Sequence, residues 1–528
     1  MIINQMTTQE QTQPTNTVSI TTSTQKNTPF FYDVTLRDGN QALKKPWNQE
    51  EKEVIFDKLI ELNVQGIEIG FPASSDMDYI SCEKLAKRAP NNVVISVLAR
   101  ATPKDIEKAA AAVRHAQRPR IHTFIAMNPL GLEHVLKKDI HTVTEIAVNA
   151  VKKAKELLPT NGEVEFSVEH FGDCRENLPD VLNAIEKVVE AGADVINLPN
   201  TVERYRPLEF VKMVEAVHNR IGNKAKISVH CHNDLGMASA TTVESFFHGA
   251  TQLETTLNGL GERAGNTNMY EVAVALNNMD IHIPLNMNKF FEASQLVSQM
   301  SNIPVWEKAP VIGSDVLAHR SGIHQDGSNK TKGLKKGQYI AFDPTVVGRY
   351  EGEHLGFTSQ SGKSALVSIY QNAGYPITMQ EAEFLMPYAK KMAEEKRSEL
   401  KIKDLDKLYR SHLCQIQGPY QLSSFDRIKE GKFLLSYQKE GIHFEKTGEG
   451  VGPINACVNA FLALGVAISV AHYEQKMLNP KDKEASDALA TIEVSNSERS
   501  VIARAINRST TKASIQALFN GLNLLSKQ

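Results

Sequence analysis

Lys226-Ile-Ser-Val-His-Cys-His232, which runs on into Asn233-Asp-Leu-Gly236, is the most informative stretch of the chain. Its β-branched residues predict a short strand. Because residues i and i+2 of a strand face the same side, His230 and His232 share one face. Two imidazoles on one face are half of a divalent metal site. Taken alone, such a pair is more often two hydrogen-bonded histidines near a buried strand, so the rest of the chain must decide.

This stretch is one of eight similar runs. From Phe30 onward, short β-branched runs alternate with amphipathic helical stretches, the pattern of β/α units on a parallel sheet. Eight strands over about 250 residues predict a (β/α)8 TIM barrel. A doubly wound sheet would carry a Gly-rich phosphate loop after its first strand, and Leu36-Arg-Asp-Gly-Asn-Gln41 is not that motif. The expected strands are Phe31–Leu36, Gly66–Ile69, Val93–Leu98, Ile121–Ala126, Val164–Val168, Val195–Leu198, Lys226–His230 and Gln252–Thr256. The expected helices include Glu50–Leu62, Asp78–Arg88, Pro103–His115, Leu178–Ala191, Pro207–Arg220, Met237–His248 and Met269–Asn278.

The chain is predicted to have four segments. Residues 1–28 are rich in Thr, Gln and Asn and predict a disordered tail, and residues 29–300 form the α/β barrel. Residues 301–415 predict a mixed helical subdomain whose long helix, Met379–Lys401, is either a solvated connector or a subunit contact. Residues 416–528 predict an α+β domain of a size that folds independently. Its expected elements are Lys432–Gln438, Ile454–Leu464, Ala467–His472, Ala488–Val494 and Thr511–Leu525.

Composition narrows the class of protein. The 528 residues carry a formal net charge of −2, which argues against nucleic-acid binding. No apolar stretch approaches the roughly 20 residues that span a bilayer. The five cysteines are scattered, without a Cys-x-x-Cys pair, as in a reducing cytosol. The N-terminal segment lacks the features of a secretion signal. The sequence therefore predicts a cytoplasmic protein.

Polar residues gather at the predicted carboxyl ends of the strands, where such barrels carry their active sites. Asp38, His230, His232 and a carbonyl from Asn266 would form a mixed oxygen and nitrogen site suited to Mg²⁺, Mn²⁺ or Zn²⁺. Arg37 would place a fixed cation where an oxyanion or enolate develops. Each residue taken alone could equally be part of a surface ion pair or a solvated loop. Their joint placement at successive strand ends favours an active site. The same strand ends contribute Glu68, His122, Ser167, Glu169, Asn197 and Thr201.

Six longer motifs carry a resemblance to a known family. The chain resembles the DRE-TIM metallolyases and, within them, the 2-isopropylmalate synthases, over about residues 30 to 525. The matching stretches are Leu36–Gln41, Ile67-Glu-Ile-Gly-Phe-Pro72, His122-Thr-Phe-Ile125, His230–Gly236, Asn258-Gly-Leu-Gly-Glu-Arg-Ala-Gly-Asn266 and Ser321-Gly-Ile-His-Gln-Asp-Gly327. The stretch around Glu445–Pro453 is similar to the family's leucine-sensing regulatory domain, so the resemblance implies a regulatory role for residues 416–528.

The resemblance implies a metal-dependent condensation of acetyl-CoA with a 2-oxo acid, here 3-methyl-2-oxobutanoate, followed by hydrolysis of the CoA ester. This is the first committed step of leucine biosynthesis. Arg37 would stabilise developing charge, and Glu169 and His324 would exchange protons. His324 and Tyr339, in the 301–415 subdomain, would complete the partner subunit's barrel in a homodimer. His122, Ser167 and Thr201 would line the 2-oxo acid pocket. The native metal, a K⁺ activator, a leucine effector and any oligomer beyond the dimer stay open.

Four departures from the family pattern bear on specificity and regulation. Three lie near the pocket, so the 2-oxo acid is less well determined than the reaction class. The fourth replaces glycines in the regulatory domain and puts feedback inhibition by leucine in doubt. Citramalate or homocitrate synthase is the nearest alternative; a hydroxymethylglutaryl-CoA lyase and a catalytically silent regulatory relative are further ones. The departures are Ala126-Met-Asn-Pro129, Glu169-His-Phe-Gly-Asp173, Pro199-Asn-Thr-Val-Glu203 and Ala503-Arg-Ala-Ile506.

Overall fold

The computed structural model describes residues 28–331, 333–334, 337–350, 354–478 and 486–527. The tail expected at residues 1–28 therefore lies outside the described residues, except for its last position. The chain splits into two compact units, each described by itself below. The first comprises the residues up to Val316 together with Pro344–Tyr350, and the second comprises Leu317–Asp343 and Glu351–Gln528.

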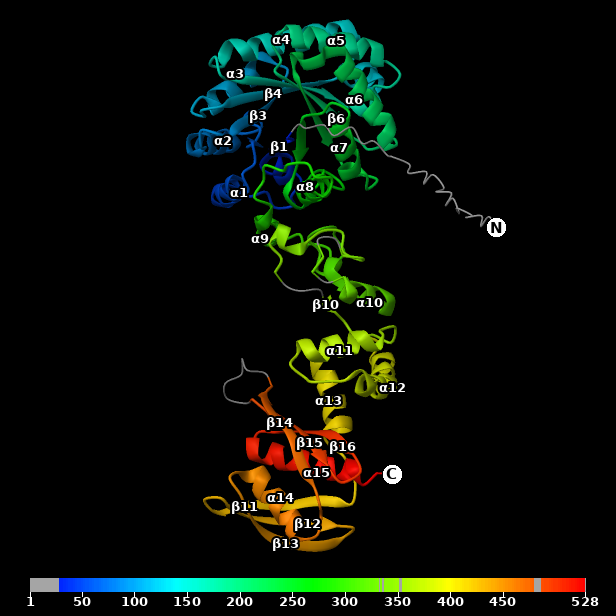
Figure 1. Ribbon diagram of the computed structural model, residues 1–528. Helices are drawn as coiled ribbons and strands as arrows, with labels where there is room; N and C mark the ends of the chain where they lie inside the picture. The colour runs from blue at the N-terminus through cyan, green and yellow to red at the C-terminus, as the bar shows by residue number, and fades with distance from the viewer. Residues whose placement is uncertain (1–27, 332, 335–336, 351–353, 479–485, 528) are drawn as a thin grey trace, which may run out of the picture. The chain divides into compact units, whose positions relative to one another are not determined.

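The first unit is a closed barrel of eight parallel strands in chain order, with the first strand paired to the eighth, as predicted (Figure 1). Helices cover the outside of the barrel, so its strands are buried on both faces. The strands are β1 (Phe30–Asp33), β2 (Gly66–Glu68), β3 (Val94–Arg100), β4 (Pro119–Ala126), β5 (Glu163–Glu169), β6 (Val195–Asn200), β7 (Lys226–Cys231) and β8 (Gln252–Thr255). The helices are α1 (Gln49–Glu61), α2 (Asp76–Arg88), α3 (Pro103–Val113), α4 (Ile140–Leu157), α5 (Leu178–Glu190), α6 (Pro207–Ile221), α7 (Ala238–Phe247), α8 (Met269–Asn278) and α9 (Phe290–Ser301).

Local signals explain where the helices begin. Asn48 and Glu51 form a reciprocal capping box at the start of α1. Thr102 caps α3, whose first residue, Pro103, has no N–H that would need a partner. On α5, Val181, Ala184, Ile185 and Val188 make one buried stripe against the barrel, as a 3.6-residue period requires.

The first strand ends earlier than expected. The sequence predicts a strand over 31–36, but β1 stops at Asp33 and the chain enters a single π-helical turn, η1 (Thr35–Gly39). The Asp33 carboxylate accepts hydrogen bonds from Thr35 N at 2.8 Å and Thr35 Oγ1 at 2.9 Å, which diverts the backbone from the sheet. Such turns are rare overall but frequent at functional sites, and this one carries Arg37 and Asp38.

A short segment distant in sequence completes the first unit. Within Pro344–Tyr350, Val347 is fully buried and the Arg349 guanidinium donates to Gly313 O at 2.8 Å. The same guanidinium lies 5.0 Å from the centroid of Phe291 on α9. The preceding turn holds Val311 at φ 67°, a left-handed conformation that is strained for a β-branched residue.

The second unit begins with helices that pack on one another. The helix expected over 379–401 ends at Lys396, where Arg397 adopts a left-handed conformation and a new helix follows. One face of α12 is buried in the core of its own unit through Ala382, Leu385 and Ala389, so it is not a bare solvated connector. The elements are β9 (Ala318–His319), α10 (Gly322–Lys330), β10 (His354–Leu355), α11 (Lys363–Asn372), α12 (Met379–Lys396) and α13 (Ile402–Leu413).

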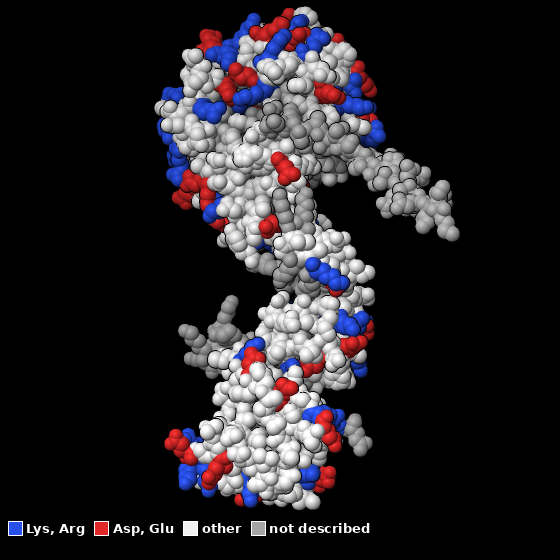
Figure 2. Space-filling model, in the orientation of Figure 1, with Lys and Arg blue, Asp and Glu red and all other residues white. Residues whose placement is uncertain are grey.

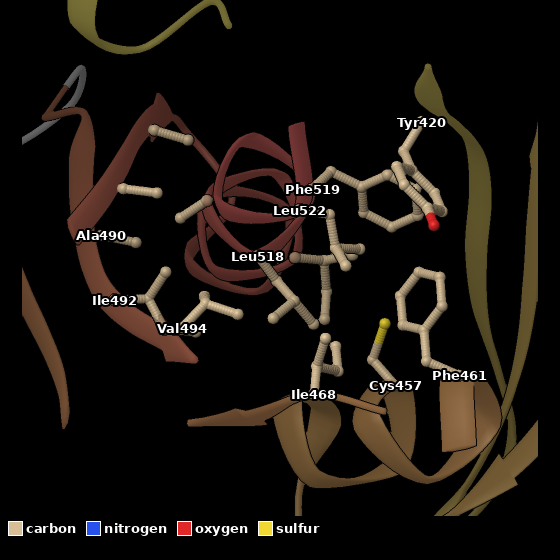
Figure 3. Close-up of a cluster of buried hydrophobic side chains, with 14 of the residues drawn as sticks. Tyr420, Cys457, Phe461, Ile468, Ala490, Ile492, Val494, Leu518, Phe519 and Leu522 are labelled. Atoms are coloured by element: carbon tan, nitrogen blue, oxygen red, sulfur yellow. The ribbon is translucent and has the colours of Figure 1, made fainter. Parts of the chain in front are cut away.

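The carboxyl-terminal part of this unit is an α+β domain, as predicted. Two three-stranded antiparallel sheets pack with two helices, and Figure 3 shows Leu518, Phe519 and Leu522 of one helix between a strand carrying Ile492 and the helix that carries Phe461. The strands over 420–429, 442–449 and 500–507 were not foreseen. The elements are β11 (Tyr420–Lys429), β12 (Lys432–Lys439), β13 (Ile442–Glu449), α14 (Pro453–Ala463), β14 (Ser469–Met477), β15 (Ala488–Ser495), β16 (Ser500–Asn507) and α15 (Thr510–Leu525).

One buried ion pair joins this domain to the helices before it. Arg504 of β16 pairs with Glu381 at the start of α12, and the Arg504 side chain is only 5% exposed. Leu489 and Ile506 extend the same contact by packing into the core that contains Tyr409. Arg504 belongs to the stretch where the resemblance predicted glycines, and here its side chain serves packing between neighbouring parts of one unit.

The surface carries mixed charge. On the face shown in Figure 2, basic and acidic side chains are interspersed over the barrel helices. In the part of the chain that the structure describes, none of the helices combines the length and the apolar character needed to cross a bilayer.

Candidate active site at the carboxyl end of the barrel

Three of the predicted metal ligands meet at the carboxyl ends of β1 and β7. One ligand atom from each of Asp38, His230 and His232 lies within 4.8 Å of the others, and all three side chains are buried. The Nε2 atoms of the two histidines are 3.2 Å apart. Burial is the largest influence on both imidazoles and lowers their pKa values, to about 4 for His230 and about 3 for His232. Both rings are therefore neutral near pH 7, the form that binds a metal.

A carboxylate behind the pair fixes one of the rings. Glu254, on β8, accepts a hydrogen bond at 3.0 Å from Nδ1 of His230 and another at 3.1 Å from Ser228. Because Nδ1 of His230 carries the proton in this contact, its Nε2 presents a lone pair toward His232. This arrangement of carboxylate and histidine is typical of metal centres.

Arg37 lies between two carboxylates. Its guanidinium donates to Glu68 Oε2 at 2.5 Å and to Asp38 Oδ1 at 2.7 Å. Burial opposes ionisation of both acids, but the cationic Arg37 and the neighbouring histidines together outweigh it and lower their pKa values, that of Glu68 to about 2. Arg37 is therefore a fixed cation beside a carboxylate that stays ionised.

Asn266 sits against Asp38. Its Nδ2 donates to Asp38 Oδ2 at 2.5 Å and to Leu260 O at 3.1 Å. Its Oδ1 is buried and accepts no hydrogen bond from the described residues, and Nδ1 of His232 is likewise buried and unbonded among them. Two facing imidazole nitrogens, an ionised carboxylate and a free amide oxygen are a donor set that fits a divalent cation.

A second polar chain crosses the barrel beside this cluster. Nδ1 of His122 contacts Glu68 Oε1 at 2.6 Å, and its Nε2 contacts Ser167 Oγ at 2.6 Å. Asn197 donates to the same hydroxyl at 2.8 Å. Burial opposes protonation of His122, but the carboxylates of Glu68, Glu165 and Glu254 together outweigh it and raise the pKa of the ring. The ring therefore lies in the wall of the space above the strands, with both of its nitrogens in contact with polar side chains.

These groups surround a cavity of about 320 Å³ at the strand ends. Glu169 and Thr201 lie in its wall, and Thr201 Oγ1 accepts from His170 N at 3.0 Å. Burial raises the pKa of the Glu169 carboxyl, against the opposing effect of His170. The remaining polar lining includes Arg37, Asp38, His122, Ser167, His230 and His232, and the apolar lining includes Phe71, Leu98, Phe124 and Pro199.

The structure thus brings together most of the residues singled out in the sequence. Asp38, His230, His232 and Asn266 lie together. The barrel residues predicted to act on the substrate all line the pocket: Arg37, His122, Ser167, Glu169 and Thr201. His324 and Tyr339 belong to the second compact unit, where their rings stack with centroids 4.3 Å apart and planes at 20°. That His324 and Tyr339 complete the active site in the partner subunit's barrel stays a prediction.

Sequence reasoning missed the carboxylate layer beneath the site. Glu254 and Gln252 alternate on β8 and face the barrel interior with Glu165 and Arg120, which is fully buried. The signal was available, because polar residues at i and i+2 of a buried strand must face other polar groups.

Comparisons with known proteins agree with this geometry. Three families match the chain: HMGL-like over residues 28–297, the post-catalytic domain-like family of alpha-isopropylmalate synthase over 314–371, and the LeuA allosteric (dimerisation) domain over 399–526. The chain is 54% identical over 381 residues to 2-isopropylmalate synthase 2 of Leptospira interrogans, covering 72% of this chain and 89% of that protein. It is 34% identical to 2-isopropylmalate synthase of Dictyoglomus turgidum, covering 94% of this chain and 98% of that protein. A third relative, 2-isopropylmalate synthase of Histophilus somni, is 35% identical over 89% of this chain and 90% of its own length.

Proposed function

Because the chain belongs to the 2-isopropylmalate synthase family, we propose that it condenses acetyl-CoA with 3-methyl-2-oxobutanoate and hydrolyses the CoA ester to give 2-isopropylmalate and CoA. This is the first committed step of leucine biosynthesis. The observation that carries the proposal is the convergence of Asp38, His230 and His232 on one buried point beside the pocket. A reaction that joins an enolate to a 2-oxo acid needs a Lewis acid and a base, and the pocket offers residues for both.

Asp38, His230 and His232, with Asn266, would hold the divalent cation, for which Mg²⁺, Mn²⁺ and Zn²⁺ are the candidates. Bound there, the cation supplies a Lewis acid that polarises the keto carbonyl of the 2-oxo acid. Arg37 adds a fixed positive charge on the same side, held in place by Glu68, where negative charge grows as the new bond forms.

The substrate side of the pocket is formed by His122, Ser167 and Thr201. His122, whose pKa is raised by the carboxylates around it, is suited to bind the substrate carboxylate, and the two hydroxyls offer further hydrogen bonds. The apolar wall formed by Leu98 and Phe124 accepts the branched alkyl group.

Glu169 is the base that we assign to the first step. Its raised pKa makes it a better proton acceptor than a solvated carboxylate. It takes a proton from the acetyl methyl group, the resulting enolate carbon bonds to the C2 carbon of the 2-oxo acid, and the former keto oxygen gains a proton. Water then attacks the thioester carbonyl and CoA leaves as the thiol. His324, with Tyr339 stacked on it, is proposed to reach this pocket from the partner subunit and to assist the proton transfers.

The proposal extends to assembly and regulation. The match to a dimerisation domain supports a homodimer, and its allosteric description supports a leucine effector. We also propose a cytoplasmic location, because all five cysteines are buried and unpaired. K⁺ as an activator belongs to the same proposal and is tested with it.

The decisive experiment measures CoA release from acetyl-CoA with 3-methyl-2-oxobutanoate, pyruvate and 2-oxoglutarate in turn. We expect the branched 2-oxo acid to give the highest kcat/KM. A preference for pyruvate or 2-oxoglutarate would replace the assignment with citramalate or homocitrate synthase. Repeating the assay with Mg²⁺, Mn²⁺ or Zn²⁺, with and without K⁺, and with leucine tests the cofactor and effector assignments.

A further inference from the structure

Glu203 is a buried carboxylate that the proposed reaction does not use. It follows β6 in the loop that begins at Thr201, and only 1% of its surface is exposed. Its Oε2 accepts a hydrogen bond from Leu235 N at 2.6 Å, and its Oε1 is buried with no hydrogen-bond partner among the described residues. Burying a carboxylate without full hydrogen bonding costs folding free energy, so its presence here calls for a role.

The carboxylate binds the start of α7. The backbone N–H groups of Leu235, Met237 and Gly236 all bear on it and lower its pKa, against the larger effect of burial, which raises it. The first turn of α7 contains no acidic residue of its own, so Glu203 is the negative charge that faces these N–H groups. The loop 233–237 is therefore held to the end of β6 through one side chain.

That loop leads directly from the metal ligands. His232 and Asn266 form a backbone bridge, and Asn233 N donates to Gly265 O at 2.9 Å. On the next residue, Asp234 binds the Arg263 guanidinium through contacts of 2.7 and 2.9 Å. The segment after His232 is thus anchored on the β8 side by Arg263 and on the β6 side by Glu203.

The two anchors close a ring through the pocket wall. The Arg263 guanidinium also donates to Thr201 O at 2.6 Å, and Thr201 is two residues before Glu203. Three strand-end loops therefore fix one another, and His232 sits inside that ring. Removing Glu203 leaves the Asp234 anchor but frees Leu235 N and its neighbours.

We propose that Glu203 is a positioning residue for the metal centre, which acts by holding the 233–237 loop so that His232 and Asn266 keep their places. This inference deepens the proposed function and rests on its metal site. Supports of this kind behind metal ligands typically change metal affinity by about 10- to 100-fold when removed.

Calorimetric titration of the full-length, metal-free protein with Mn²⁺ tests this. We expect E203A to raise the Kd for Mn²⁺ about 10-fold. E203Q keeps an oxygen that accepts from Leu235 N, so its Kd should stay within about 2-fold of wild type. The matched control is E271Q, which neutralises another largely buried carboxylate; Glu271 lies on α8 and accepts a hydrogen bond from Ser239 of α7 at 2.5 Å. The Kd of E271Q should not change.

Hydrogen exchange adds a local readout. The amides of Leu235 and Met237 should exchange faster in E203A than in wild type or E271Q, and added formate should slow them again by refilling the vacated site. Unchanged Mn²⁺ affinity and unchanged exchange in a folded E203A overturn the inference. If E203A does not fold, E203D, whose carboxylate is one methylene short of Leu235 N, replaces it and should also weaken Mn²⁺ binding; wild-type affinity in E203D overturns the inference.

The outcome is separable from that of the proposed function, because Mn²⁺ binding needs no 2-oxo acid. Wild-type protein that binds Mn²⁺ but releases no CoA with any of the three 2-oxo acids refutes the reaction and leaves the role of Glu203 standing. Wild-type activity together with an unaltered E203A refutes the role of Glu203 alone.

Discussion

His230 and His232 place their Nε2 atoms 3.2 Å apart in the barrel, with ring centroids 4.9 Å apart and planes at 76°. Glu254 accepts a hydrogen bond from Nδ1 of His230, so the Nε2 of that ring faces its neighbour as a lone pair. With both pKa values lowered by burial, the pair can be satisfied only by one proton on His232 or by a cation between the rings.

Replacing His230 with alanine should abolish measurable Mn²⁺ binding and CoA release while the barrel stays folded, because a strand-end residue contributes little core. Calorimetry and circular dichroism on the same preparation check both halves. The matched control is S96A, a change at a buried β3 residue whose hydroxyl has no hydrogen-bond partner among the described residues. Normal turnover in H230A contradicts the metal assignment.

Glu254 should affect metal affinity through the His230 ring that it orients. We expect E254A to weaken Mn²⁺ binding by about 10- to 100-fold, since His230 loses the acceptor that fixes its tautomer. E254Q, which retains an amide oxygen as acceptor, should lose less. The order wild type, E254Q, E254A in Mn²⁺ affinity is the diagnostic result, and equal affinities in all three would contradict it.

Glu169 should control the chemical step more than binding. E169Q cannot accept a proton, so kcat should fall by about 100-fold or more while the KM for the 2-oxo acid changes little. Steady-state CoA release measures both constants. A mutant that raises KM at unchanged kcat would make Glu169 a binding residue and leave the base unassigned.

The carboxylate layer should make barrel stability depend on pH. Burial raises the pKa of Glu165 from 4.5 to about 7, despite the nearby Arg120. Between those values the folded barrel keeps a proton that the unfolded chain releases, so the free energy of unfolding falls as the pH rises through this window. E165Q should remove up to about 3 kcal/mol of that dependence. Thermal unfolding of both proteins over the same pH range decides the point, and parallel curves would count against it.

The pair between Arg504 and Glu381 should stabilise the second unit. R504M leaves the Glu381 carboxylate partly buried without its cation, which should destabilise this unit by about 3 kcal/mol. The control K391M removes an exposed pair with Glu395 on the same helix and should cost less than about 0.5 kcal/mol. Thermal unfolding of each variant is the test. Equal decreases in Tm for R504M and K391M would show that the buried pair stabilises the unit no more than an exposed one.

Much of the fold was readable from periodicity. The strand ends at His230 and Thr256 were placed within one residue, because β-branched runs bounded by turns have few other solutions in a parallel barrel. The start of β1 was readable but its end was not, since the π-helical turn depends on the side chain of Asp33 folding back on Thr35. The strand 442–449 was missed because its many exposed polar residues hide the alternation.

The sequence predicted the site residues that combine a ligand-type side chain with a position at a strand end. Asp38, His230 and His232 are strong ligands at strand ends, so topology alone brought them together. Glu254 and Glu203 were not found, because a glutamate in a strand or a loop says nothing by itself about the partner that burial forces on it. Such partners depend on neighbouring strands and loops, which a single sequence does not display.

The seven residues Pro344–Tyr350 determine where related synthases can be joined to make chimaeric proteins. Although they follow the barrel by almost thirty positions in sequence, Val347 and Arg349 are part of its packing against Phe291 and Gly313. A chimaera that fuses this barrel at Val316 to another synthase's tail inherits a foreign segment at that place. Exchange of specificity between relatives should therefore succeed when residues 344–350 travel with the barrel, and should yield aggregating hybrids when they do not.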